Sequence, residues 1–273
     1  MILQSPHTHF ATRNHVNIFG KGSQTLLFAH GFGCDQNMWR FITPAFENEY
    51  KIILFDYVGA GKSDISAYNA ERYSTLSGYA KDILEICEEL QLRDVIFVGH
   101  SVSAMIGMLA ANEQPKYFSK MIMVSPSPCY INDGDYVGGF ERADIEGLLD
   151  MMEKNYIGWA NFLAPTVMAN PDRPDLEDEL TQSFCSTDPV IARRFAETTF
   201  FSDNRQDLKY NKMDSLVLQC TDDMLAPLAV GDYLDKHLPF SVLRVMKATG
   251  HCPHMSHPEE VIKLMKAFLQ PEL

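Results

Sequence analysis

Ser101, His251 and one of the adjacent pair Asp222 and Asp223 are residue types that together can carry out nucleophilic catalysis. A serine hydroxyl is a weak nucleophile until an imidazole takes its proton, and a carboxylate is needed to orient that imidazole. Along the chain the three types follow the order Ser, Asp, His, which is one of the orders found in catalytic triads. We therefore predict covalent attack by Ser101 on a carbonyl carbon, with His251 as the base.

Ser101 follows the apolar run 95–98, and a pattern of small residues typical of a packed helix comes after it. A Gly-x-Ser between a buried strand and a helix is the layout of a nucleophile elbow, a sharp turn that exposes the serine. Such a turn requires small residues on both sides of the nucleophile, here Gly99 and Ser103. Ser103 stands where the common G-x-S-x-G pattern has its second glycine, and we expect this change to cost little stability.

His251 is the favoured base because it comes directly after the last predicted strand, at the edge of the sheet where Ser101 is also expected. His254 and His257 share the loop with His251, so a metal cluster is the rival interpretation. Pro253 and Pro258 interrupt the helix that an HExxH-type metal site requires. We therefore expect no metal site and no cofactor.

The acid and the oxyanion donors complete the predicted site. Asp222 and Asp223 both lie just beyond a strand, and we expect one to support the base while the other faces solvent or caps the next element. The backbone N–H groups of Phe32 and Val102 are expected to hold the oxyanion. Losing one such donor typically costs about 3 kcal/mol of transition-state stabilisation. His30, which opens the loop before Phe32, is expected to be structural.

These residues require a parallel sheet whose strand ends meet at one edge. Continuous apolar runs predict strands buried on both faces, and helical periodicity predicts helices between them. The expected strands are 26–29, 52–55, 95–98, 121–124, 215–220 and 242–246, and the expected helices are 36–46, 76–90 and 258–269. Residues 14–19 alternate in polarity and are expected to end in an edge hairpin turn at 20–23. The fold class is therefore α/β, with a mostly parallel central sheet flanked by helices.

Residues 132–203 contain helical periodicity interrupted by prolines and no buried strand. A stretch of about 70 residues is too long for a loop. Inserted between two strands at the carboxyl edge of a parallel sheet, it would cover the ligand crevice. We predict a core domain of residues 1–131 and 204–273, and a helical lid of residues 132–203.

The lid is expected to contain one helix with Leu148 to Trp159 on a single face, followed by helices at about 176–184 and 189–198. Its aromatic content exceeds what packing of short helices requires. We expect some of these aromatic side chains to line an apolar pocket above the nucleophile that favours small uncharged substrates. The residues chosen for this role are Trp159, Phe162, Phe195 and Phe200.

Composition limits the partners. The chain has 273 residues, of which 46% are hydrophobic, and a net charge of −13 that argues against nucleic acid or an anionic membrane as a partner. No apolar run reaches the roughly 18 residues of a membrane span. Residues 1–14 lack an apolar signal core, so a cytoplasmic location is expected. The six cysteines show no CxxC spacing and are expected to be reduced.

Four longer strings resemble the RsbQ-type α/β-hydrolases, which are bacterial regulators of the general stress response controlled by sigma-B. The strings are GFGCDQ (31–36), MMEKNYIGWA (151–160), FCSTDPVIAR (184–193) and GHCPHMSHP (250–258). The resemblance implies an α/β-hydrolase fold, a Ser–His–Asp triad and a four-helix lid over a small apolar pocket. Its Asp-x-x-x-Pro motif matches Asp223 and Pro227, which favours Asp223 as the acid.

The same resemblance implies an RsbP-like phosphatase partner that activates the alternative sigma factor. Plant karrikin and strigolactone receptors are also similar and share the Phe201-Ser202-Asp203-x-Arg205 type of segment. The leading interpretation is a serine hydrolase that generates or senses a small hydrophobic signal for the phosphatase. A metabolic carboxylesterase without a partner and a non-catalytic small-molecule receptor are the alternatives.

Overall fold

The computed structural model describes residues 9–270 and contains a seven-stranded sheet. The strand order is β1-β3-β2-β4-β5-β6-β7, and every neighbouring pair is parallel except β1 with β3. The strands are β1 (Asn17–Gly20), β2 (Thr25–Ala29), β3 (Lys51–Phe55), β4 (Val95–His100), β5 (Phe118–Val124), β6 (Asp214–Asp222) and β7 (Ser241–Thr249). All residues of β2 and β4 are buried, as continuous apolar runs predict.

The predicted hairpin at the start of the chain is wrong, although its strand is at the edge of the sheet. β1 pairs with β3 in antiparallel orientation and does not contact β2 as a ladder partner. Three of the four β1 residues are exposed, whereas β2 is buried throughout. A strand that is largely exposed fits only at the margin, so β3 takes the place beside β2.

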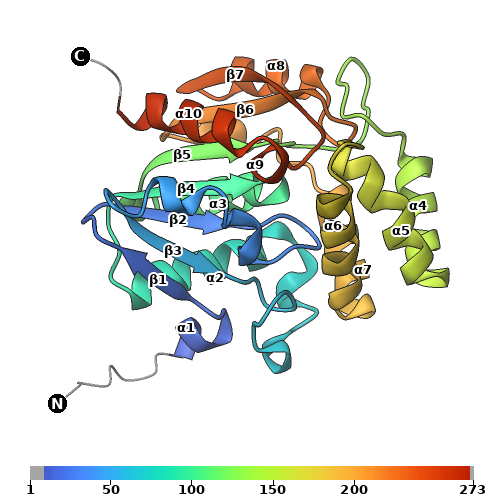
Figure 1. The fold of residues 1–273 in the computed structure, drawn as a ribbon, viewed down its shortest axis with the longest axis horizontal. Coiled ribbons are helices and arrows are strands. Elements are labelled where there is room, and N and C mark those ends of the chain that lie inside the picture. Colours follow the sequence, from blue (N-terminus) through green and yellow to red (C-terminus); the bar gives the residue numbers. More distant parts are fainter. Residues whose placement is uncertain (1–8, 271–273) are drawn as a thin grey trace.

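Helices cover both faces of the sheet (Figure 1). α2 (Leu76–Glu89), α3 (Val102–Glu113) and α8 (Leu228–His237) share one buried cluster with one face, and α10 (Pro258–Leu269) shares the other cluster. The remaining core helices are the short α1 (His9–Arg13) and α9 (Pro253–Ser256). The helix expected at 36–46 is two 3₁₀ turns, Gln36–Trp39 and Thr43–Ala45, because Pro44 prevents a continuous α-helix. This architecture is the predicted α/β-hydrolase fold.

Four helices lie between β5 and β6 in sequence and together beyond the carboxyl ends of the parallel strands (Figure 1). They are α4 (Arg142–Lys154), α5 (Tyr156–Met168), α6 (Pro174–Ser186) and α7 (Pro189–Phe200). We refer to α4–α7 as the lid helices. The helix expected to carry Leu148 to Trp159 is divided at Asn155, which has non-helical backbone angles and accepts a hydrogen bond from Gly158 N at 2.9 Å. An N-cap inside the periodic run ends one helix and begins the next.

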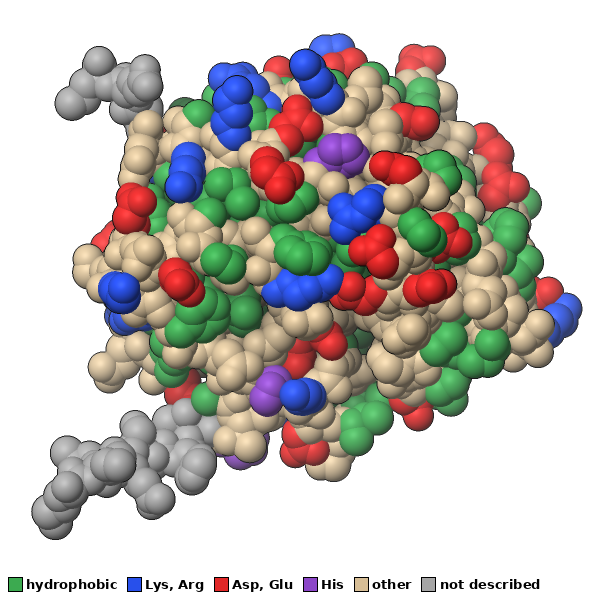
Figure 2. All heavy atoms as spheres, viewed as in Figure 1, with side chains coloured by type: hydrophobic (Ala, Val, Ile, Leu, Met, Phe, Trp, Pro, Cys, Tyr) green, Lys and Arg blue, Asp and Glu red, His purple; other side chains and the backbone are tan. Residues whose placement is uncertain are grey.

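The division into domains stays a prediction, and residues 1–8 and 271–273 of the predicted core lie outside the described residues. The face of the molecule in Figure 2 carries acidic and basic side chains interspersed with each other. Within residues 9–270, no helix combines the length and apolarity needed to cross a membrane. The same residues contain no group of three or more His, Cys, Asp or Glu side chains placed to hold a metal ion. The six cysteines are unpaired thiols, and only Cys185 is more than slightly exposed.

Candidate active site

The turn between β4 and α3 holds Ser101 in a strained conformation. Its backbone angles are φ 57° and ψ −127°, a region that residues with a side chain rarely adopt. A Cβ at Gly99 would lie 2.7 Å from backbone atoms of Ser103, so only glycine allows this approach. The sequence pattern therefore folds into the sharp strand–turn–helix geometry of a nucleophile elbow.

Ser101, His251 and Asp223 form one chain of hydrogen bonds. Nδ1 of His251 lies 2.8 Å from Oδ2 of Asp223, and Nε2 lies 2.7 Å from Oγ of Ser101. A carboxylate can only accept, so Nδ1 carries the proton and the unprotonated Nε2 faces the serine hydroxyl. All three residues are buried. The structure thus brings together the three predicted side chains, in the arrangement that activates a serine.

Asp223 is held by its own turn as well as by the histidine. Its Oδ1 accepts hydrogen bonds from Leu225 N at 2.9 Å and from Ala226 N at 3.2 Å. One oxygen is therefore fixed by backbone while the other orients His251. Asp222 is exposed, and its carbonyl oxygen accepts from Gly250 N at 2.7 Å. Of the two adjacent aspartates, only Asp223 contacts the base.

The two predicted oxyanion donors come from different segments, Val102 from the start of α3 and Phe32 from the loop after β2. Val102 is the first residue of α3, where backbone N–H groups have no partner inside the helix. Phe32 lies in the loop after β2 and lines the cavity that contains Ser101. Its N–H has no acceptor in the described part of the chain. The role of both groups as oxyanion donors stays a prediction.

A small cavity of about 20 Å³ opens onto Ser101, which is room for about one water molecule. Its walls include core and lid residues: Phe32, Cys34, His100, Tyr130, Leu163, Val167, Leu180, Phe184, Thr199, Phe200, Leu225 and Cys252. Burial raises the pKa of the Cys34 thiol to about 12, so this wall is uncharged at neutral pH. The lining is mostly apolar, and the free space beside Ser101 is small.

The predicted pocket residues differ in their positions. Phe200 lines the cavity. Trp159 and Phe195 are buried one layer behind it, with ring centroids 6.0 Å and 5.7 Å from that of Phe32. The prediction for Phe162 is wrong, because its side chain is 56% exposed. On α5 the buried face carries Leu163, and Phe162 is rotated about 100° away from it.

Two hydroxyl groups in the cavity were not predicted from the sequence. Tyr130 Oη lies 3.4 Å from Ser101 Oγ, and burial raises the pKa of this phenol, so it is a neutral donor. Thr199 is buried, and its hydroxyl has no hydrogen-bond partner among the described residues. Tyr130 follows the end of β5, and that position at the carboxyl edge was the available signal. Thr199 lies on a lid helix and offered none.

Three lid helices are hydrogen-bonded to the core, and two of them, α5 and α6, are bonded to loops of the site. The carbonyl oxygen of Val167 on α5 accepts from His251 N at 2.8 Å. Ser183 on α6 donates to the carbonyl oxygen of Gly33, next to Phe32, at 2.7 Å. On the outer side of α6, Glu179 forms a two-pronged ion pair with Arg40, at 2.7 Å and 2.5 Å. On α7, Thr198 donates to the carbonyl oxygen of Tyr73. The lid helices therefore contact both the base and the oxyanion loop.

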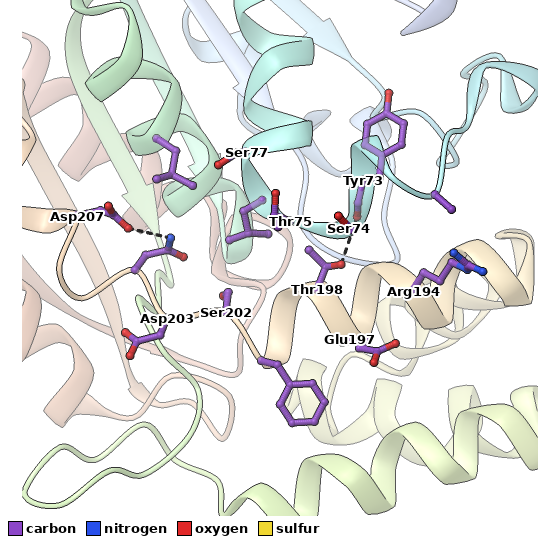
Figure 3. A pocket seen from close by; sticks show the side chains of 15 residues that line it. Tyr73, Ser74, Thr75, Ser77, Arg194, Glu197, Thr198, Ser202, Asp203 and Asp207 are labelled. Atoms are coloured by element: carbon purple, nitrogen blue, oxygen red, sulfur yellow. Dashed lines mark hydrogen bonds between the residues drawn. The ribbon is translucent and has the colours of Figure 1, made fainter.

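A second, larger depression of about 660 Å³ lies between α7 and the start of α2 (Figure 3). Thr198 and Arg194 from α7 line it on one side, and Tyr73 and Thr75 line it on the other. None of the three triad side chains lines this groove. Size alone therefore does not identify the reactive site, whereas the hydrogen-bonded triad does.

Comparison with known proteins agrees with this geometry. The profile described as Alpha/beta hydrolase family matches residues 26–264. The chain is 39% identical to Karrikin insensitive 2 receptor CA of Petunia hybrida, covering 92% of this chain and 94% of the relative. It is 36% identical to Strigolactone esterase D14 of Arabidopsis thaliana, covering 93% and 95%.

Among solved structures, the hydrolase olei00960 from Oleispira antarctica is 46% identical, with a TM-score of 0.94 and 97% of each chain covered. An esterase from Exiguobacterium antarcticum, at 20% identity and a TM-score of 0.86, shares the fold, with 93% of this chain and 94% of that chain covered. The fold, the strained elbow and these matches agree with one another. This chain belongs to the α/β-hydrolase family.

Proposed function

We propose that this protein is a serine hydrolase that cleaves a small, uncharged carboxylic ester through acylation of Ser101. The observation that carries the proposal is the continuous relay from Asp223 through His251 to Ser101, which ends in an apolar cavity. The esterase-named relatives add support.

The geometry assigns each proton in the reaction. Ser101 Oγ bonds to the ester carbonyl carbon while its proton moves to Nε2 of His251, 2.7 Å away. The N–H groups of Phe32 and Val102 receive the oxyanion of the tetrahedral intermediate. The imidazolium then protonates the leaving alcohol as its C–O bond breaks. Water, deprotonated by the same nitrogen, then attacks the acyl carbon, and the imidazolium returns this proton to Ser101 Oγ as the acyl C–O bond breaks and the carboxylic acid leaves.

The walls of the cavity favour a substrate without charge. Within residues 9–270, no lysine, arginine, aspartate or glutamate is among the side chains that line it. A charged acyl or alcohol group would lose its hydration there without gaining a partner. Small hydrophobic esters are therefore the expected substrates, and even these require displacement of the lid helices, because the cavity has room for about one water molecule.

The role we propose for this reaction is signalling. The strings that resemble the RsbQ-type regulators support a positive regulator of the general stress response that acts through an RsbP-like phosphatase. A non-catalytic receptor is the second candidate, favoured by the receptor-named relatives and by the small volume of the cavity. A metabolic carboxylesterase without a partner is the third.

Replacement of Ser101 by alanine tests these alternatives. On p-nitrophenyl esters of increasing acyl length, we expect the wild-type protein to hydrolyse the short esters and Ser101→Ala to be inactive. In cells, stress-response output should be lost with Ser101→Ala while the phosphatase still co-purifies. Output that survives the substitution would favour the receptor. A wild-type protein that prefers charged or long-chain esters would contradict the proposed substrate class.

A further inference from the structure

The side chain of Ser103 connects the elbow helix to the loop that carries Phe32. Ser103 is the second residue of α3 and is completely buried. Its hydroxyl donates to the carbonyl oxygen of His30 at 2.5 Å and lies 3.1 Å from Tyr57 Oη. The residue that replaces the common second glycine of the elbow therefore makes a bond that glycine cannot make.

His30 continues this connection through its ring. The backbone N–H of Tyr57 donates to Nε2 of His30 at 3.1 Å. Because a backbone N–H can only donate, Nε2 is unprotonated and the proton is on Nδ1. Nδ1 lies 2.9 Å from the carbonyl oxygen of Gly31 and donates to it. The tautomer of His30 is thus determined by a backbone group outside the loop.

The orientation of the Phe32 N–H follows from these two bonds. The Gly31 carbonyl and the Phe32 N–H belong to one planar trans peptide, so they point in opposite directions. With the carbonyl bound by His30, the N–H is turned away from that ring. The preceding peptide, between His30 and Gly31, is held by Ser103. Two consecutive peptides before the oxyanion donor are therefore each anchored by a side chain.

We propose that Ser103 is a positioning residue for the Phe32 N–H in the oxyanion hole. This inference rests on the proposed hydrolase function. An oxyanion donor stabilises the transition state only if it is already oriented toward the developing charge. Without the Ser103 hydroxyl, the His30 carbonyl loses this donor, and one of the two peptides that precede the Phe32 side chain loses its side-chain anchor. The expected loss falls on the transition state, because a neutral ester bound in the ground state depends little on this donor.

A purely structural role for Ser103 is the alternative, and Ser215 provides a matched control. Ser215 is also completely buried, donates to the carbonyl oxygen of Met213 at 2.9 Å and lies 2.9 Å from Nδ2 of Asn211. It is located at the amino end of β6, the opposite end of that strand from Asp223. Ser215→Ala therefore removes similar bonds without contacting the site.

The experiment compares wild type, Ser103→Ala and Ser215→Ala. It measures kcat and KM on a p-nitrophenyl ester, and inhibition by a trifluoromethyl ketone, whose adduct with Ser101 carries an oxyanion. We expect Ser103→Ala to lower kcat about 10- to 100-fold and to raise the inhibition constant of the ketone by a similar factor. KM should stay within about twofold of the wild-type value. Ser215→Ala should lower the melting temperature comparably and leave all three kinetic constants within about twofold.

Equal kinetic constants in Ser103→Ala and Ser215→Ala would overturn the positioning role of Ser103 but not the proposed hydrolase function. So would a rise in KM at unchanged kcat in Ser103→Ala. Ser101→Ala separates this outcome from failure of the proposed function. Wild-type turnover that depends on Ser101 supports the hydrolase, whatever the result at Ser103. A wild-type protein with neither turnover nor a ketone adduct would overturn both proposals.

Discussion

Nε2 of His100 lies 2.8 Å from the backbone carbonyl oxygen of His251. The carbonyl can only accept, so His100 donates through Nε2 and its Nδ1 is unprotonated. That second nitrogen faces Gly31, where an added Cβ would lie 2.4 Å from it. The side chain next to the nucleophile thus fits between the loop of the base and the loop of Phe32. Three segments that are distant in sequence are kept at a fixed separation by one ring.

The assignment of the acid leads to the first prediction. Asp223→Asn should lower kcat by about 10⁴-fold, because the amide no longer stabilises the required tautomer of His251 and its cation. The kcat of Asp222→Asn should remain within about twofold of the wild-type value, since the Asp222 side chain is exposed. Steady-state kinetics on one ester, with circular dichroism to verify folding, measures both. Greater damage from the Asp222 change would reverse the assignment.

His254 leads to the second prediction, on acid stability. It is completely buried, its ring contacts those of Trp39 and His100 in tilted geometry, and neither ring nitrogen has a partner among the described residues. Burial lowers its pKa from 6.5 to about 3, and the nearby His251 and Arg40 act in the same direction. In the folded protein His254 is therefore neutral at every pH above this value.

The sign of the pH effect follows directly. Between pH 6.5 and about 3 the unfolded chain binds a proton at residue 254 that the folded protein does not bind. The free energy of unfolding therefore falls as the pH is lowered, by about 1.4 kcal/mol per pH unit from this group. His254→Phe keeps an aromatic ring against Trp39 and removes the proton. Urea unfolding at pH 7, 5.5 and 4.5 gives the free energy of unfolding at each pH. This free energy should fall less with decreasing pH in the variant than in the wild type, and an equal fall would contradict the prediction.

Thr199 leads to the third prediction. A buried hydroxyl without a partner costs free energy, and valine has nearly the same shape. We expect Thr199→Val to leave the free energy of unfolding unchanged or to raise it by about 1 kcal/mol, whereas most buried substitutions lower it. Thermal and urea unfolding measure the change. A loss of more than about 1 kcal/mol would mean that the hydroxyl is bonded in the folded protein.

Phe200 leads to the fourth prediction, on substrate size. Its ring centroid lies 6.1 Å from that of Phe32 and 5.2 Å from that of Tyr130, and Phe200 forms part of the cavity wall. Phe200→Ala should shift the preference toward longer acyl chains and lower the free energy of unfolding by about 3–5 kcal/mol. Phe162→Ala is the control, because its exposed ring should affect neither property. A chain-length profile that is unchanged in Phe200→Ala would refute the assignment of this wall.

The sequence predicts the core of the fold because its strands are continuous apolar runs that need two covered faces. It could not predict that β1 pairs with β3, since that choice depends on which strand is exposed after the sheet forms. The periodic run from Leu148 to Trp159 likewise did not reveal the break at Asn155. The cap competes with helix continuation, and tertiary packing decides between them.

The catalytic candidates were accessible from the sequence because each follows the end of a strand, where a parallel sheet collects its loops. The pocket was less accessible, since it depends on the rotation of each lid helix about its own axis. Phe162 and Leu163 are sequence neighbours, yet one faces solvent and the other the cavity. Aromatic content alone carries no information on that rotation.

On the proposed hydrolase function, the contacts between the lid helices and the site would set the order of events in a catalytic cycle. A cavity with room for about one water molecule admits an ester only after the lid helices move. Movement of α5 would break the bond that His251 N donates to the Val167 carbonyl oxygen, and movement of α6 would break the bond that Ser183 donates to the Gly33 carbonyl oxygen. The open molecule can load substrate but has a loosened base or oxyanion loop. We therefore expect chemistry to begin on reclosure, and the apparent affinity for a ligand that enters the open form to fall in proportion to the open fraction.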